Sequence, residues 1–350
     1  MNIKQSPISI LLLLLVLALS CNKNSDDSLG KYSGGIFISN EGTFQQENGS
    51  VSYYNPESDT VINDLFLVQN GRSVGDMVHS LSTNKNRAYI CVRGSGKVEV
   101  TDLNFKSVAT IGGIDGARYF MVANNQKGYV SSWESNQISV IDLSNNSVKG
   151  TISIGHSGHD KMLVDNELLF IANSGGNGVD STISVIDISS DLVVNTIYLD
   201  AYKPVNMLKD SSDNLWVLCQ GKEYKHLGGP SPAKLIKISL TTLEISNSVQ
   251  LFENQQPMFI AISPDQQTIY YGGGLDFTGI YKINTTDLVV EGTSFITPKY
   301  FSMGVDASSG QILALESPNY TSTGKLHVYS PEGIHLKSYN VGIAPGNINY

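Results

Sequence analysis

One sequence pattern recurs seven times along this chain, and it constrains the fold more than any other feature. Each copy has a segment of alternating apolar residues, a short polar turn and a second apolar segment, as in "ISVIDLSNNSVKGTI". Alternation with a period of two is typical of β-strands with one buried face. The copies begin 40 to 52 residues apart, which is the spacing of blades in a β-propeller. They start at Val51, Val98, Ile138, Ile183, Leu235, Ile280 and Leu326.

Two further strands accompany each copy, so each repeat predicts a blade of four antiparallel strands. Only the first blade lacks its innermost strand, because nothing suitable precedes "GIFISNEG", which begins at Gly35. The last residues, "GNINY", have the pattern of the missing strand. We therefore predict an all-β, seven-bladed propeller of four-stranded blades in one domain, residues 34–350. Its ring is closed by the C-terminal strand pairing next to the N-terminal strand, which removes open sheet edges.

The first 33 residues are predicted to be a leader and a tether. The apolar run from Ile8 to Leu19 is shorter than the ~20 residues that span a bilayer, and it fits a secretory signal peptide over residues 1–20. The segment "ALSC" that follows is similar to a bacterial lipobox, which implies lipidation of Cys21. An ordinary secreted protein cleaved near Ser20 is the alternative. Residues 21–33 predict a flexible tether, because no apolar residue follows Cys21 until Leu29. The propeller would then work beside a membrane without entering it.

Charge and cysteine content narrow the classes of partner. The formal net charge of −9 argues against nucleic acid, because phosphates demand a basic face. Cys91 and Cys219 fall in distant blades, so we expect two small buried hydrophobic residues and no disulfide.

Spare sequence is concentrated on one face of the predicted propeller. The turns between the first and second strands and between the third and fourth strands are minimal, whereas the connections on the other face expand, as in "CQGKEYKHLGGPSPAK". Long loops are disproportionately functional, so this loop face is the predicted binding face. Its polar and aromatic residues are the candidate ligand-binding set: Asn40, Glu41, Phe44, Arg72, Arg93, Arg118, Tyr119, Trp133, Asn173, Gln220, Tyr224, Tyr300 and Tyr320.

Several other patterns have simple structural explanations. Asp102, Asp142 and Asp187 occupy one repeat position that Asn or Ser fills in other blades, and all of these can cap a tight turn through a side-chain oxygen. "HSGH" offers two possible metal ligands without a third, and "NSGGNGVDST" has oxygens suited to Ca²⁺ without the spacing of an EF-hand loop. We therefore predict no required cofactor, and a Ca²⁺ ion is left as an open alternative.

The repeats resemble a known class of protein. "ISVIDLSNNSVKGTISIG" and "PMFIAISPDQQTIYYGG" look like the YVTN-type repeats of surface-layer-like bacterial propellers. "GIFISNEGTF" and "NGRSVGDMVHSL" are similar to the start of surface lipoprotein propellers of Bacteroidetes that capture corrinoids such as cobalamin. Asp26 and Asp27 resemble the acidic export signal of such surface lipoproteins. The resemblance implies a lipid-anchored protein on the outer membrane that passes a corrinoid to a TonB-dependent transporter.

Two other functions remain as alternatives. A propeller of this kind can bind another nutrient or an envelope protein without catalysis. A propeller lyase or lactonase is the third hypothesis, because Glu41, Glu134 and Glu316 lie where loops begin. No "GxSxG" occurs, and no histidine recurs in a way that places it against an acid on the loop face. We therefore expect a binding protein that is not an enzyme.

Overall fold

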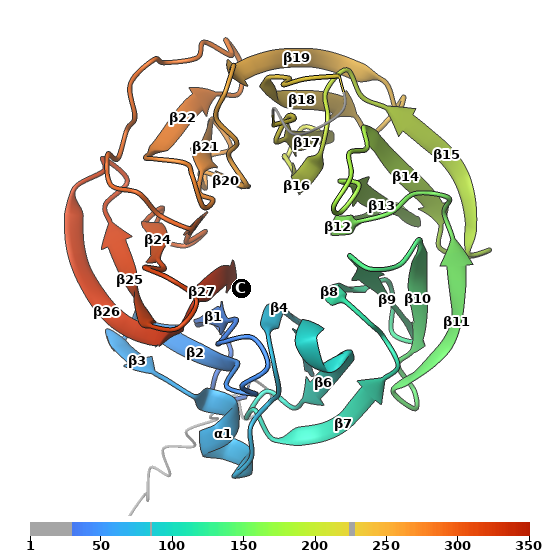
Figure 1. The fold of residues 1–350 in the computed structure, drawn as a ribbon, viewed down its shortest axis with the longest axis vertical. Helices are drawn as coiled ribbons and strands as arrows, with labels where there is room; N and C mark the ends of the chain where they lie inside the picture. The colour runs from blue at the N-terminus through green and yellow to red at the C-terminus, as the bar shows by residue number, and fades with distance from the viewer. Residues whose placement is uncertain (1–29, 85, 224–227) are drawn as a thin grey trace, which may run out of the picture.

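The chain forms seven antiparallel β-sheets arranged in a ring around a central axis (Figure 1). The structure is a computed structural model that describes residues 30–84, 86–223 and 228–350. The prediction of a seven-bladed β-propeller is confirmed. We number the blades from the N-terminus and list each from the axis outward, so that blade 2 runs from β4 to β7.

The blades have the following strand bounds. Blades 1 to 3 contain β27 (Pro345–Asn349), β1 (Ile36–Asn40), β2 (Ser50–Asn55) and β3 (Thr60–Ile62); β4 (Val78–Thr83), β5 (Ala88–Val92), β6 (Lys97–Thr101) and β7 (Ser107–Gly112); β8 (Ala117–Val122), β9 (Lys127–Ser132), β10 (Gln137–Asp142) and β11 (Ser147–Ser153). Blades 4 and 5 contain β12 (His159–Asp165), β13 (Leu168–Asn173), β14 (Thr182–Asp187) and β15 (Leu192–Tyr198); β16 (Pro204–Lys209), β17 (Asn214–Cys219), β18 (Ala233–Ser239) and β19 (Ile245–Phe252). Blades 6 and 7 contain β20 (Phe259–Ile262), β21 (Thr268–Gly272) and β22 (Ile280–Asn284); β23 (Ser302–Val305), β24 (Ile312–Glu316), β25 (Thr323–Tyr329) and β26 (His335–Ile343).

Blade 6 departs from the four-strand expectation. It has three regular strands, β20, β21 and β22. An isolated bridge between Ile280 and Ile296 is what attaches the following segment to β22. The segment "VVEGTS" that was expected to form the fourth strand is irregular, with Val289 largely exposed. Gly292 and its polar neighbours break the apolar alternation there, and an outermost strand has no further sheet to hold it in place.

The C-terminal strand closes the ring as predicted. β27 pairs antiparallel with β1, with Ile348 opposite Ile38 and Asn347 opposite Ser39. It is also tied to the next blade, because Asn347 Nδ2 donates to the backbone oxygen of His79 at 2.8 Å. β1 and β27, which are the first and last strands of the described residues, therefore lie side by side in blade 1 (Figure 1).

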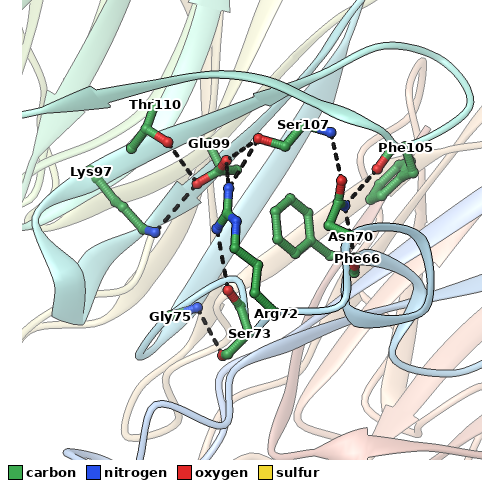
Figure 2. A network of polar contacts seen from close by, with 10 residues as sticks. All are labelled: Phe66, Asn70, Arg72, Ser73, Gly75, Lys97, Glu99, Phe105, Ser107 and Thr110. Atoms are coloured by element: carbon green, nitrogen blue, oxygen red, sulfur yellow. Dashed lines mark hydrogen bonds and ion pairs between the residues drawn. The ribbon is translucent and has the colours of Figure 1, made fainter.

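A short helix interrupts the β-structure between blades 1 and 2. α1 (Leu65–Asn70) was not expected from the sequence, which shows almost no helical periodicity. The helix buries Leu65 and Phe66 and ends at Gly71, whose left-handed conformation (φ 68°) suits glycine. Asn70 joins it to blade 2, donating to the Phe105 carbonyl oxygen at 2.9 Å (Figure 2).

Hydrophobic side chains fill the spaces between neighbouring blades. Between blades 2 and 3, for example, the rings of Tyr89 and Phe120 stack with centroids 4.0 Å apart. The polar residues at the third-to-fourth-strand turns cap them as predicted: Asp142 Oδ1 accepts from the Ser144 amide at 2.8 Å, and Asp187 Oδ1 accepts from the Ser190 amide at 2.8 Å. Cys91 and Cys219 are buried free thiols, as predicted.

The N-terminal leader lies outside the described residues, together with Cys21 and most of the predicted tether. The end of the predicted tether is ordered within the fold: Tyr32 is buried and packs edge-on against Tyr53 at 5.1 Å. Across the described ranges, no helix is long and apolar enough to cross a membrane.

Candidate functional site

The loop face carries a concentration of charged and aromatic side chains near the axis, contributed by blades 1 to 4. They come from two kinds of position: the first residues of an innermost strand and the residues just after a second strand. β4, β8 and β12 are neighbouring innermost strands around the axis (Figure 1), and β1, β5 and β9 end on the same face. Segments that are about 40 residues apart in the sequence are thereby brought together.

Trp133 is the centre of the first group, which we call the Trp133 stack. It follows β9, and two guanidinium groups lie over its ring, with Arg93 Cζ 4.9 Å and Arg118 Cζ 5.1 Å from the ring centroid. Arg93 is also 3.5 Å from Glu134, and Arg118 Nε donates to Asp160 Oδ1. Cations over an indole ring are attracted by the negative potential of its face. The stack therefore combines a flat aromatic surface with two guanidinium groups that carboxylates also hold.

The second group, the axial cluster, consists of Glu41, His79, Arg118, Tyr119 and Lys161. His79 Nδ1 lies 3.9 Å from Glu41 Oε1, and the His79 ring meets the Tyr119 ring edge-on at 5.0 Å. Lys161 Nζ lies over the same tyrosine ring at 5.0 Å. Tyr119 thus contacts both the histidine of blade 2 and the lysine of blade 4.

Burial and charge shift the acidity of these groups. Desolvation, together with the nearby charges of Arg118, Arg93 and Lys161, holds the pKa of His79 well below its usual value, so the imidazole is neutral. Desolvation raises the pKa of Glu41, although Arg118 and Arg93 oppose the shift. Desolvation lowers the pKa of Lys161. Three cations thus act on this one buried imidazole, and two of them, Arg93 and Arg118, are paired with the carboxylates of Glu134 and Asp160.

A wide cleft adjoins the Trp133 stack. It has a volume of about 960 Å³ and is lined by Arg93, Trp133, Glu134 and residues 175–178, among others. The lining is mainly polar. Gly158 and Gly176 allow two loops to meet at its wall: a Cβ on Gly158, whose φ is 63°, would lie 1.8 Å from the Gly176 nitrogen.

The suggested metal sites have other partners. His156 Nδ1 lies 2.7 Å from Asp180 Oδ2, and His159 Nδ1 lies 3.1 Å from Asn173 Oδ1. Asp180 Oδ1 accepts from Thr182 Oγ1 at 2.7 Å, so its carboxylate is already used within the loop. No group of three or more His, Cys, Asp or Glu residues that could hold a metal ion occurs among residues 30–84, 86–223 and 228–350.

Five candidate residues are brought together near the axis: Glu41, Arg93, Arg118, Tyr119 and Trp133. Four other candidates are held in internal contacts: Asn40, Arg72, Asn173 and Tyr300.

Asn40 is fully buried and donates to Ser52 Oγ at 3.0 Å, and Asn173 is fully buried and donates to Ser184 Oγ at 2.9 Å. Both amides tie strand ends together.

Arg72 and Tyr300 are occupied away from the axis. Arg72 pairs with the buried Glu99 and lies 4.9 Å over the Phe66 ring, on the outer part of blade 2 (Figure 2). Tyr300 is buried, and its hydroxyl contacts that of Tyr329. These contacts leave little of either side chain for a ligand.

The remaining candidates lie on the periphery of the loop face. Phe44 is 62% exposed, and Tyr320 is 44% exposed. Their loops touch, since Thr43 Oγ1 donates to the Tyr320 carbonyl oxygen at 3.1 Å. Gln220 lines a second cleft of about 450 Å³ between blades 5 and 6. Tyr224 lies outside the described residues.

Sequence reasoning missed His79, Asp160 and Lys161. It found no histidine that recurs against an acid, and the structure instead places single histidines beside acids: His79 is 3.9 Å from Glu41, His156 is 2.7 Å from Asp180, and His327 is 2.9 Å from Glu316. All three missed residues lie near the start of an innermost strand, in "DMVHSL" and "GHDKML". Comparing that position across the seven repeats would have found them. Each of them occurs in one blade only, so a search for recurring residues did not find them.

Comparisons with known proteins support the fold. A family model described as "Domain of unknown function (DUF5074)" matches residues 34–342. No curated protein matches the chain.

Three solved structures resemble it at low identity. A Bacteroides thetaiotaomicron structure titled as a quinonprotein alcohol dehydrogenase-like protein is 17% identical, with a TM-score of 0.66 over 91% of this chain and 78% of that one. A putative 6-phosphogluconolactonase from Bacteroides fragilis is 12% identical, with a TM-score of 0.66 over 91% and 98%. Hydrazine synthase from Kuenenia stuttgartiensis is 14% identical, with a TM-score of 0.60 over 76% and 86%. At these identities the likeness extends to the propeller fold alone.

Proposed function

The chain belongs to the family described as Domain of unknown function (DUF5074), and from its site we propose that it is a non-catalytic binding protein that captures a corrinoid over the loop face of its propeller. The observation that carries the proposal is the Trp133 stack at the edge of the 960 Å³ cleft. A corrinoid is a broad disc with amide groups around its rim. Guanidinium groups can donate to amide oxygens, and the indole offers a flat apolar surface.

Rigidity of the site favours tight binding without chemistry. Arg93 and Arg118 are held by carboxylates as well as by the indole ring, so few side-chain conformations are lost when a ligand binds. The cleft is wide and open, which suits a large ligand bound through many contacts.

We further propose that the protein is a lipoprotein of the outer membrane, anchored through Cys21 and exposed at the surface, and that it hands its ligand to a TonB-dependent transporter. The supporting observation is the lipobox-like "ALSC" with the acidic residues that follow. Replacement Cys21→Ser should abolish incorporation of labelled fatty acid and release the protein from the membrane fraction. Unchanged labelling would refute the anchor.

Calorimetric titration of cyanocobalamin into the purified protein tests the binding proposal. One-to-one binding is expected, and Trp133→Ala should weaken it by about tenfold or more, as loss of a central aromatic contact does. Tyr198→Ala is the matched control, because Tyr198 is a 74% exposed aromatic residue on the outer strand β15. Absence of binding would refute corrinoid capture and leave another nutrient or an envelope protein as the ligand.

One specific observation favours a second candidate, a propeller lyase or lactonase. His79 and Glu41 lie 3.9 Å apart near the axis, and a neutral buried histidine beside a carboxylate is a common general base. One structural neighbour also has a title that names a putative lactonase. Lactone hydrolysis that is lost in His79→Gln would support this candidate, and inactivity on a panel of lactones would reject it.

A further inference from the structure

We propose that the axial cluster is an oxyanion subsite that takes a carboxylate or phosphodiester group of the bound ligand. The inference rests on the proposed binding function and deepens it, because it names the part of the ligand that lies nearest the axis. The body of the ligand would then occupy the cleft beside Trp133.

The first argument is the convergence of cations from three blades. Arg93 follows β5, Arg118 lies on β8, and Lys161 lies on β12. Arg93 and Arg118 have carboxylate partners in Glu134 and Asp160. Lys161 has no carboxylate within ion-pair distance among the described residues, and its ammonium group lies over the Tyr119 ring. A ligand oxyanion would supply the missing counter-charge.

The second argument is an unused hydrogen-bonding atom. The His79 side chain is more than nine-tenths buried, and its Nε2 atom has no hydrogen-bond partner. Its other ring nitrogen is 3.9 Å from Glu41, which is too long for a hydrogen bond. A buried polar atom without a partner is unfavourable and calls for an explanation. The neutral imidazole can carry a proton on Nε2 and donate it to an anionic oxygen.

The type of group follows from the donors that are present. Guanidinium, ammonium and imidazole N–H groups stabilise negative charge, and charge-assisted hydrogen bonds of this kind are stronger than neutral ones. Glu41 is the one carboxylate beside His79, and burial raises its pKa, which weakens its opposition to an anion. Arg118 belongs to both the axial cluster and the Trp133 stack, and Trp133 lines the cleft, so one side chain contacts both parts of the proposed site.

Titration with inorganic phosphate at constant ionic strength tests the subsite without a corrinoid. Saturable quenching of tryptophan fluorescence is expected in the wild type. Lys161→Met should weaken phosphate binding by about 10- to 100-fold, the usual effect of losing a hydrogen bond to a charged group. Lys149→Met is the matched control, because Lys149 is exposed on the outer strand β11 and should change nothing. Absence of saturation, or equal weakening in both variants, would overturn the subsite.

Three corrinoids distinguish the two possible sources of the anion. Cyanocobalamin has a phosphodiester, cobyric acid has a carboxylate, and dicyanocobinamide has neither group. The subsite predicts that Lys161→Met leaves the binding of dicyanocobinamide unchanged. If the anion is the phosphodiester, the variant weakens binding of cyanocobalamin; if it is a carboxylate, the variant weakens binding of cobyric acid. Equal loss for all three would overturn it.

The two proposals can fail separately. If phosphate binding depends on Lys161 and no corrinoid binds, the corrinoid proposal is refuted and the subsite is supported. Tight binding of all three corrinoids, insensitive to Lys161→Met and without phosphate binding, would support corrinoid capture and overturn the subsite. Lys161→Arg should retain phosphate binding, which separates loss of charge from loss of fold.

Discussion

Asn349 is the residue at which closure of the ring can be tested most directly. It lies on β27 and is 9% exposed. Its Oδ1 atom accepts from the backbone nitrogen of Leu81 in blade 2 at 3.0 Å, and its Nδ2 atom donates to Ser39 Oγ in blade 1 at 2.9 Å. One side chain therefore joins the closing strand to the strands on both of its sides.

Replacement Asn349→Ala should destabilise the propeller by about 2 to 4 kcal/mol. The alanine leaves the Leu81 amide and the Ser39 hydroxyl without this partner, and each orphaned buried group costs about 1 to 3 kcal/mol. The lower part of the summed range is expected, because β27 lies beside the axis, where water can replace some of the lost hydrogen bonds.

Urea unfolding followed by tryptophan fluorescence measures the effect. Asn195→Ala is the matched control, because Asn195 is exposed on the outer strand β15, and it should change the free energy of unfolding by less than about 0.5 kcal/mol. Ser39→Ala should also cost less in the Asn349→Ala background than in the wild type, since its partner is already lost. A loss below about 0.5 kcal/mol for Asn349→Ala, or strict additivity with Ser39→Ala, would refute the reasoning.

Three further predictions concern other parts of the molecule. Arg72→Met should lower the free energy of unfolding, measured in urea, by about 1 to 3 kcal/mol. This is less than for a fully buried pair, because Arg72 is 45% exposed and Lys97, 3.3 Å from Glu99, still neutralises that carboxylate. A loss smaller than that of Lys325→Met, a control at an exposed site, would contradict the prediction. The pKa of His79 in the folded protein is well below 6.5, so the unfolded protein binds more protons at this residue, and stability should fall as the pH decreases below about 6.5. The His79→Gln variant should therefore lose less stability than the wild type between about pH 6.5 and 5. Equal pH profiles of the free energy of unfolding would count against this. The raised pKa of Glu41 changes the pH dependence of stability in the opposite direction. The wild type and His79→Gln must therefore be compared with each other at each pH. Burial raises the pKa of Cys91 to about 12, so iodoacetamide should leave both Cys91 and Cys219 unmodified in the folded protein and modify them in urea, as mass spectrometry would show.

The sequence alone determined the architecture of this protein. Alternating strands and polar turns are local patterns, so seven repeats could be counted, and the lone strand at the C-terminus could be assigned to the first blade. The turn residues were also predictable, because Asp142 and Asp187 act on backbone atoms two or three residues away. α1 was missed because six residues with only two buried side chains give no detectable helical period.

Only the tertiary structure decided which polar residues meet. Glu41, His79, Arg118 and Lys161 come from four blades, and no local pattern relates them, because their proximity depends on the curvature of the whole ring. The same packing removed Arg72 and Tyr300 from the loop face by supplying them with Glu99 and Tyr329 as partners. Strand pairing is encoded by periods of two residues. The site at the axis depends on contacts between residues about 40 positions apart, and only the folded ring brings these residues together.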